Sequence, residues 1–162
     1  MEIPDILIKQ LQKAHHVAVL TGAGVSAESG IKTFRDPDGL WAKLNPQELA
    51  SVDGFMANPE VVWSWYQHRL EIINNSKPNP GHYAIAEMEK LFPQFSMITQ
   101  NVDRLHQRAG STNVIELHGN IVENHCFDCH KPYALDTSPD YKTLPVCPQC
   151  GGRIRPSVVW FG

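Results

Sequence analysis

The stretch Thr21-Gly22-Ala23-Gly24-Val25-Ser26-Ala27-Glu28-Ser29-Gly30-Ile31 decides the fold of this chain. It follows Val17-Ala18-Val19-Leu20, a short apolar run rich in β-branched residues, which predicts a buried parallel strand. The stretch itself predicts a glycine turn and then a helix, which Ser26 can cap. Such an arrangement presents backbone N–H groups to a pyrophosphate, with Gly22 for the turn and Gly24 for close approach of the phosphates. A glycine turn after a strand is often only a turn, so the fingerprint alone leaves both interpretations open.

The remaining chain alternates between helical and strand-like patterns. Asp5 is a candidate cap for an N-terminal packing helix, and Asn58 with Pro59 opens a long second helix. Strands that alternate with helices indicate an α/β fold with a parallel sheet. Helices are expected over 5–15, 58–75 and 82–92, further strands over 95–98 and 114–117, and a long loop or short broken helices over 32–48.

Length, composition and charge restrict the class of protein. The chain has 162 residues, 42% of them apolar, which indicates one globular domain of ordinary size. The net charge of −3 and the lack of a basic run argue against nucleic acid or an anionic membrane as the main partner. No apolar run approaches the ~18 residues of a membrane span, and residues 1–5 lack a signal-peptide pattern. We therefore expect a cytoplasmic protein with reduced thiols.

Four cysteines form a metal-binding pattern. Cys126 and Cys129 make one Cys-x2-Cys pair, Cys147 and Cys150 make another, and the gap between the pairs falls within the ~15–20 residues typical of zinc sites. Four thiolates leave no open position for water, so this pattern predicts one structural zinc ion rather than a catalytic one. Disulfides or free thiols are the weaker alternatives. The flanking histidines that could substitute as ligands are His125 and His130.

Polar residues follow the second and third predicted strands. His118 ends an apolar strand and precedes a glycine, while Gln100, Asn101 and Asp103 come directly after the strand at 95–98. The carboxyl ends of parallel strands line the crevice in which ligands bind, so these side chains are candidates for a site. A polar turn and a structural histidine are the ordinary alternatives. His106 more simply packs or caps locally.

Several motifs appear together in a fixed order and resemble the sirtuin family, the NAD-dependent protein lysine deacylases. The motifs are Gly22 to Ile31, Lys32-Thr33-Phe34-Arg35-Asp36, Thr99-Gln100-Asn101-Val102-Asp103, Leu117-His118-Gly119 and Val158-Val159-Trp160-Phe161-Gly162. The resemblance implies a Rossmann-like parallel sheet with helices on both faces and a small zinc ribbon module. It implies an NAD-binding core over 1–120 with a helical insertion around 40–80, a zinc module over 121–155, and a return to the core over 156–162.

The resemblance also implies roles for individual residues. The family binds NAD and acyl-lysine proteins or peptides, and it releases nicotinamide and O-acyl-ADP-ribose. His118 takes the position of the general base, and Asn101 is the second catalytic residue. Val159 and Phe161 take substrate-binding positions. The implied NAD-binding residues are Gly22, Ala23, Gly24, Ser26, Ile31, Phe34, Arg35, Trp41, Gln100, Asn101, Val102, Asp103 and His118.

Tyr66 and Arg69 lie three residues apart on one predicted helix and so share a face. An ordinary amphipathic helix explains the pair, but Tyr-x-x-Arg here resembles the desuccinylase and demalonylase branch of the sirtuins. An arginine fork and a phenol can hold the carboxylate at the end of an acyl chain. Pro37 departs from that branch, which has a small alanine there, and so leaves the acyl preference open.

Family members continue well beyond Gly162 with the loops that hold the adenosine half of NAD, so the last part of the sheet is expected to be missing from this chain. Two other functions therefore stay open. One is a protein ADP-ribosyltransferase that uses the same NAD site. The other is a truncated, non-catalytic module that binds zinc or a partner. The sequence does not predict the oligomeric state.

Overall fold

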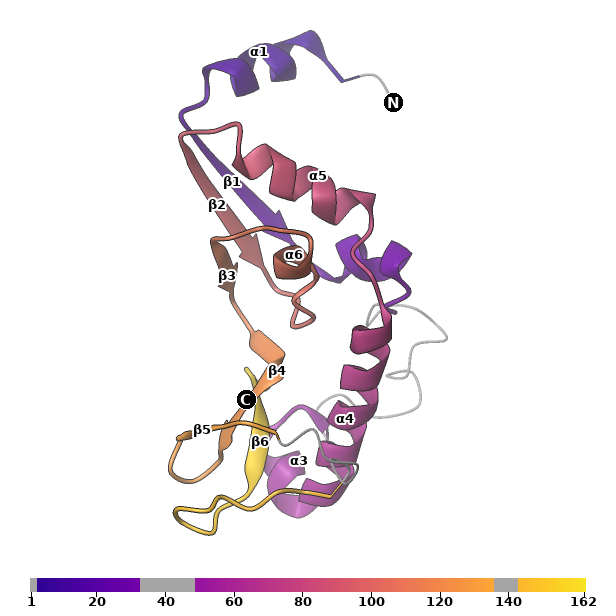
Figure 1. The fold of residues 1–162 in the computed structure, drawn as a ribbon, viewed down its shortest axis with the longest axis vertical. Coiled ribbons are helices and arrows are strands. Elements are labelled where there is room, and N and C mark those ends of the chain that lie inside the picture. The colour runs from indigo at the N-terminus through magenta and orange to yellow at the C-terminus, as the bar shows by residue number, and fades with distance from the viewer. Residues whose placement is uncertain (1–2, 33–48, 136–142) are drawn as a thin grey trace.

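The computed structural model describes residues 3–32, 49–135 and 143–162 of the chain. These residues form two parts, one built on a parallel sheet and the other on an antiparallel sheet (Figure 1). The elements in chain order are α1 (Asp5–Lys13), β1 (His16–Thr21), the 3-10 helix η1 (Ala23–Ser29), α3 (Val52–Ala57), α4 (Pro59–Asn75), α5 (Pro80–Glu89), β2 (Gln94–Thr99), α6 (Leu105–Arg108), β3 (Val114–Glu116), β4 (Gly119–Cys126), β5 (Pro132–Tyr133) and β6 (Ile154–Val158).

The parallel sheet has the strand order β1-β2-β3, which confirms the predicted α/β class. Its register aligns Leu20, Ile98 and Ile115, so these side chains share one face, while Met97 points to the other. Met97 is 0% exposed, whereas Leu20 is 62% and Ile115 is 53% exposed. Helix α5 packs against β2 and α6. Helices were expected on both faces, and in the described part of the chain the Leu20 face remains open to solvent.

The prediction of a fully buried first strand is therefore wrong. Along β1, exposed residues alternate with half-buried ones, because only one face of the strand has a packing partner among the described residues. A run such as Val17 to Leu20 fits a strand covered on both faces, but the apolar character of the run does not itself supply the second layer.

The apolar core lies between α3, α4 and the antiparallel sheet. Phe55 of α3 is fully buried, and its ring centroid lies 5.1 Å from that of Trp160 and 5.4 Å from that of Phe127. Helix α4 also places Trp63 in a second buried cluster with Cys126, Cys147 and Ile154. One helix therefore supports both the cavity described below and the cysteine cluster.

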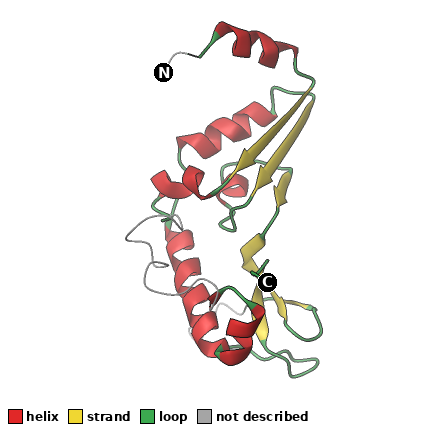
Figure 2. Ribbon diagram, turned by 180° about the vertical axis from the view of Figure 1, so that it is seen from behind, coloured by secondary structure: helices red, strands yellow, loops and turns green. Residues whose placement is uncertain are grey.

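The antiparallel sheet has the order β5-β4-β6, with β4 in the centre. Figure 2 shows its strands as a group separate from the parallel sheet. The chain passes from one sheet to the other through Leu117 and His118, between the end of β3 and the start of β4. Gly119 then adopts a left-handed conformation with φ of 65°. A Cβ atom there would lie 2.0 Å from the carbonyl oxygen of Ser157, so only glycine fits this crossing.

Several local predictions need correction. The N-terminal helix has Pro4 rather than Asp5 at its cap, and none of its residues is buried, so it does not pack as expected. The glycine turn leads into the short 3-10 helix η1, and Ser26 lies inside that helix instead of capping it. Helix α5 begins at Pro80, earlier than predicted, because the Asn79 side chain caps it. Two short helices, α3 and α6, were not predicted.

Asn79 also joins two elements. Its side-chain nitrogen donates to the carbonyl oxygen of Val25 at 2.7 Å and to the hydroxyl of Ser29 at 2.9 Å, while its oxygen caps α5. The asparagine therefore fixes the glycine turn against the start of α5. Asn58 occupies the predicted cap position of α4, but its side chain makes no capping bond.

The predicted loop or short broken helices over 32–48 lie outside the described residues except for Lys32, and so do Thr33, Phe34, Arg35, Asp36, Pro37 and Trp41. Over residues 3–32, 49–135 and 143–162, every helix is too short or too polar to cross a lipid bilayer.

Candidate active site

A cavity of about 370 Å³ opens at the carboxyl edge of the parallel sheet, where β1, β2 and β3 end beside α4 and the C-terminal segment. It brings together most of the described residues for which a cofactor or substrate role was expected. Gly22 and Gly24 do not line it. The lining residues are Ala23, Ser26, Ile31, Lys32, Ala50, Trp65, Tyr66, Arg69, Ile73, Gln100, Asn101, Val102, Asp103, His118, Val158, Val159, Trp160 and Phe161.

The His118 side chain reaches the cavity from the connection between the two sheets. Its Nδ1 atom lies 3.1 Å from the carbonyl oxygen of Gln100. A carbonyl only accepts, so Nδ1 carries a proton and donates it. The carbonyl of His118 in turn accepts from the backbone N–H of Val159 at 2.9 Å. In a neutral ring with this orientation, Nε2 is the nitrogen that can accept a proton.

The hydroxyl of Ser26 is the centre of a buried polar cluster that also lines the cavity. It donates to Asp103 Oδ2 at 2.7 Å and accepts from Asn101 Nδ2 at 3.1 Å. Asp103 Oδ1 accepts from the backbone N–H of Leu105 at 2.9 Å, and the backbone N–H of Asn101 donates to Thr99 Oγ1 at 3.0 Å. Each polar side chain of this cluster is therefore held in one orientation before any ligand binds.

Two buried histidines stand behind this cluster. His82 Nδ1 accepts from the backbone N–H of Asn79 at 3.2 Å, so its Nε2 atom, 3.4 Å from Ser26 Oγ, carries the proton. His106 Nε2 lies 3.0 Å from Thr21 Oγ1, and the two rings are 4.8 Å apart. Burial, and for His106 also the charge of His82, lowers both pKa values, that of His106 to about 4. The His106 ring therefore contacts Thr21 and His82, both far away in the chain, and not only its sequence neighbours as expected.

His82 was not predicted to lie beside the site. The sequence does contain the spacing of a capping box, since His82 is the third residue after the cap Asn79. In this motif the side chain of the third residue accepts a hydrogen bond from the backbone N–H of the cap. That pattern predicts a local role. Its second contact, with Ser26, joins residues far apart in the chain, and no local pattern reports it.

Tyr66 and Arg69 form the wall contributed by α4. Tyr66 Oη accepts from Trp160 Nε1 at 2.9 Å, so its own O–H proton remains to be donated. Burial raises the pKa of Tyr66 to about 12, against the effects of the Trp160 hydrogen bond and of the Arg155 and Arg69 charges. The phenol therefore stays a hydrogen-bond donor at neutral pH. Arg69 Cζ lies 5.1 Å from the centroid of the Trp65 ring.

Arg69 is the cation of this wall. Burial lowers its pKa, while the nearby Tyr66 and Asp103 raise it in part. The cavity thus has a cation on α4 and a carboxylate beyond β2. Val159 and Phe161, which also line it, are both largely exposed apolar residues.

The four predicted metal ligands lie together at the far end of β4. The sulfur atoms of Cys126 and Cys150 are 3.5 Å apart and those of Cys129 and Cys147 are 3.8 Å apart, and all four lie within 4.8 Å of one another. Zn–S bonds of about 2.3 Å place tetrahedral sulfurs about 3.8 Å apart, so the cluster fits zinc. His125 Nδ1 is instead 2.8 Å from Ser157 Oγ, and neither flanking histidine belongs to the cluster.

Comparisons with known proteins agree with this arrangement. Residues 22–162 match the model of the Sir2 family. The chain is 51% identical over 162 residues to NAD-dependent protein deacylase 2 of Pyrobaculum aerophilum, covering 100% of this chain and 63% of that protein. It thus spans less than two thirds of that relative.

Solved structures give the same result. The chain resembles a Sir2 homologue in complex with NAD, with a TM-score of 0.89 and 48% identity over 99% of this chain and 63% of the other. It also resembles a Sir2 protein bound to deacetylated p53 peptide and 3′-O-acetyl ADP ribose, with a TM-score of 0.82 and 37% identity over 97% and 65% of the two chains. The chain therefore belongs to the Sir2, or sirtuin, family.

Proposed function

We propose that this chain carries the reaction centre of an NAD-dependent protein lysine deacylase. The observation that carries the proposal is the single cavity into which the His118 imidazole, the Asn101–Asp103 cluster and the Tyr66–Arg69 pair all project. The NAD and peptide complexes of related Sir2 proteins support the same assignment.

His118 acts as the general base. With its proton on Nδ1 and donated to Gln100, the Nε2 lone pair is available to remove a proton from a ribose hydroxyl of bound NAD. The backbone bond from Val159 to the His118 carbonyl ties this base to the segment proposed to hold the peptide. Positioning of base and substrate is thus shared by one stretch of backbone.

Asn101 and Asp103 orient the nicotinamide end. A carboxylate and an amide in a buried corner match the N–H and C=O groups of a carboxamide and the hydroxyls of a ribose. When bound, NAD supplies the electrophilic ribose carbon and the nicotinamide leaving group. Ser26 keeps Asn101 and Asp103 in place, because it bonds to both. Ala23, Ile31, Gln100 and Val102 form the adjoining walls.

Tyr66 and Arg69 select the acyl group. Arg69 can donate two parallel N–H bonds to a carboxylate, and Tyr66 can add its O–H, whose proton is not used in the bond with Trp160. We therefore propose succinyl- or malonyl-lysine alongside acetyl-lysine as substrates. Val159 and Phe161, exposed and apolar, contact the stem of the lysine or the peptide.

Zinc is structural in this proposal. Cys126, Cys129, Cys147 and Cys150 would hold the ion and close the loops at the end of β4. The cluster is not among the residues that line the cavity, so no catalytic step is assigned to the metal.

Incubation of the chain with NAD and an acyl-lysine peptide tests the function. Mass spectrometry should find free lysine, nicotinamide and O-acyl-ADP-ribose in equal amounts. Transfer of ADP-ribose to the protein or peptide without loss of the acyl group would indicate the ADP-ribosyltransferase instead. Absence of both products together with absence of NAD binding by calorimetry would leave the non-catalytic module. Lys90→Gln, which removes an exposed ion pair with Glu87, is a control variant that should behave as the unaltered chain.

A further inference from the structure

The orientation of the His118 imidazole depends on a short, exposed segment of the chain. His118 is exposed, and it lies in the short connection between the parallel sheet and the antiparallel sheet. Its ring makes one hydrogen bond, to the Gln100 carbonyl, among the bonds of the described residues. The direction of the imidazole therefore depends on how firmly β3 and β4 are held relative to each other.

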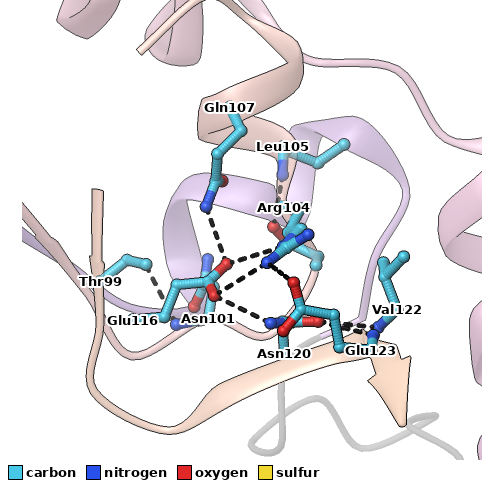
Figure 3. A network of polar contacts seen from close by, with 10 residues as sticks. Thr99, Asn101, Arg104, Leu105, Gln107, Glu116, Asn120, Val122 and Glu123 are labelled. Atoms are coloured by element: carbon cyan, nitrogen blue, oxygen red, sulfur yellow. Dashed lines mark hydrogen bonds and ion pairs between the residues drawn. The ribbon is translucent and has the colours of Figure 1, made fainter. Parts of the chain in front are cut away.

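One guanidinium group joins both sides of this connection. Arg104 Nε lies 3.1 Å from Glu116 Oε1, two residues before His118, and Arg104 Nη2 lies 2.6 Å from Glu123 Oε1, five residues after it. Figure 3 shows the two carboxylates converging on Arg104 from β3 and β4. Arg104 itself directly follows Asp103 of the cavity. A single side chain thus ties the Asp103 loop to the last residue of β3 and to the middle of β4.

Glu116 is more than a surface partner. It also accepts from Gln107 Nε2 at 2.7 Å and from Asn120 Nδ2 at 2.9 Å, and its side chain is only 15% exposed. Asn120 in turn accepts from the backbone N–H of Glu123 at 2.8 Å. A carboxylate with several donors in a partly closed site is held in one position, unlike an isolated exposed pair.

The backbone of Arg104 has an unusual conformation for a residue with a side chain. Its φ of 57° is left-handed, a conformation that favours glycine over any residue with a Cβ. The residue is held there while its side chain makes bonds that a glycine could not make.

We propose that Arg104 is a positioning residue for the deacylase reaction, which clamps Glu116 and Glu123 on either side of His118 and so fixes the imidazole against the Gln100 carbonyl. This inference rests on the proposed function. Arg104 does not line the cavity and is assigned no contact with NAD or the peptide. Its loss should therefore change turnover and leave ligand affinity nearly unchanged.

The test compares Arg104→Gln with the control Lys90→Gln in the full chain. Arg104→Gln should lower kcat by about 10-fold while KM for NAD stays within about 2-fold, because a displaced base slows proton removal without removing a binding contact. Amide hydrogen exchange should accelerate at Leu117 and Val159, whose N–H groups donate to Thr99 and His118. Lys90→Gln should change none of these quantities.

Further variants separate a clamp from general destabilisation. Arg104→Gly relieves the left-handed backbone and should still lose turnover. Glu116→Gln should have a larger effect than Glu123→Gln, since Glu123 is 59% exposed and Glu116 is not. Combining Arg104→Gln with Glu116→Gln should cost no more than the worse single change.

The proposal is overturned if Arg104→Gln matches Lys90→Gln in kcat and in exchange, or if Arg104→Gly restores full turnover. If the unaltered chain releases no lysine, the proposed deacylase function is contradicted, independently of the role of Arg104. The exchange rates of Leu117 and Val159 still decide whether Arg104 orders the His118 connection.

Discussion

The parallel and antiparallel sheets both support the cavity, but different interactions hold them. The parallel sheet has one closed face, with Met97 fully buried, and its carboxyl edge is fixed by buried hydrogen bonds around Ser26. The antiparallel sheet packs on α4 through an apolar cluster that includes two of the metal ligands, Cys126 and Cys147. The parallel sheet therefore depends on apolar packing of one face and on buried hydrogen bonds, whereas the antiparallel sheet depends on apolar packing against α3 and α4 and would depend also on zinc held by the four cysteines. Separate perturbations should reach them separately.

Loss of zinc should have the largest effect. Apparent binding free energies of structural zinc reach about 10–16 kcal/mol, so Cys126→Ser or Cys147→Ser should release the ion and unfold the antiparallel sheet. Zinc content and amide exchange measure this. Exchange should rise throughout β4 and β6 and much less in β1 and β2. Val146→Ala, at an exposed neighbour of Cys147, is the control. Full zinc content in both serine variants, or equal unfolding of the two sheets, would break the comparison.

Removal of the base should abolish chemistry without affecting either sheet. General-base contributions are about 10²–10⁴-fold, so His118→Ala should lower kcat by that factor. The side chain is exposed, and the melting temperature should stay near that of the unaltered chain. Kinetic assays and thermal melts together check this. Turnover within a few-fold of the unaltered chain would show that His118 is not the base.

Arg69→Met should change the choice of acyl group. Charge-assisted hydrogen bonds contribute about 1.5–3 kcal/mol, so kcat/KM for a succinyl peptide should fall by about 10–10²-fold or more. An acetyl peptide has no carboxylate to lose, and its kcat/KM should change little. Arg153→Met, at an exposed arginine of the zinc part, is the matched control. Equal losses of kcat/KM for both peptides would show that Tyr66 and Arg69 do not select the acyl group. The proposed substrate would then be acetyl-lysine alone.

Acid should weaken the parallel part through His106. The folded pKa of His106 is about 4, below the ~6.5 of an unfolded histidine, so the unfolded chain binds more protons between these values. The contribution of His106 to stability is complete above about pH 6.5 and falls by up to about 1.4 kcal/mol per pH unit as the pH drops toward 4. His106→Gln, which keeps a donor toward Thr21, should flatten this slope in denaturant titrations at several pH values. An unchanged slope would remove His106 as its source.

The sequence predicted those features that depend on local spacing. Each Cys-x2-Cys pair predicts a tight turn that brings two thiolates together within a few residues. The structure places all four sulfur atoms at distances compatible with zinc. The strands β1, β2 and β3 follow from apolar runs, and their polar followers meet because parallel strands end at one edge.

Features that depend on partners far away in the chain were not predictable. Serine is a common helix-capping residue, yet the Ser26 hydroxyl bonds to Asp103 and Asn101, which are 77 and 75 residues away in the chain. Whether β1 is buried depends on what covers Leu20, and α1 has apolar periodicity without a buried contact among the described residues. The short helices α3 and α6 have too few turns to show a period.

Asn79 carries one more consequence, which concerns chemical ageing. Its side chain joins the glycine turn to α5, so conversion to aspartate would remove the donor to Val25 and Ser29 and place a charge there. The usual conversion begins when the nitrogen of the next residue attacks the side-chain amide and loses its proton. The next residue is Pro80, whose nitrogen has no proton to lose. Pro80, the first residue of α5, therefore also protects Asn79 from spontaneous deamidation. The glycine turn beside the cavity should keep its geometry over long storage.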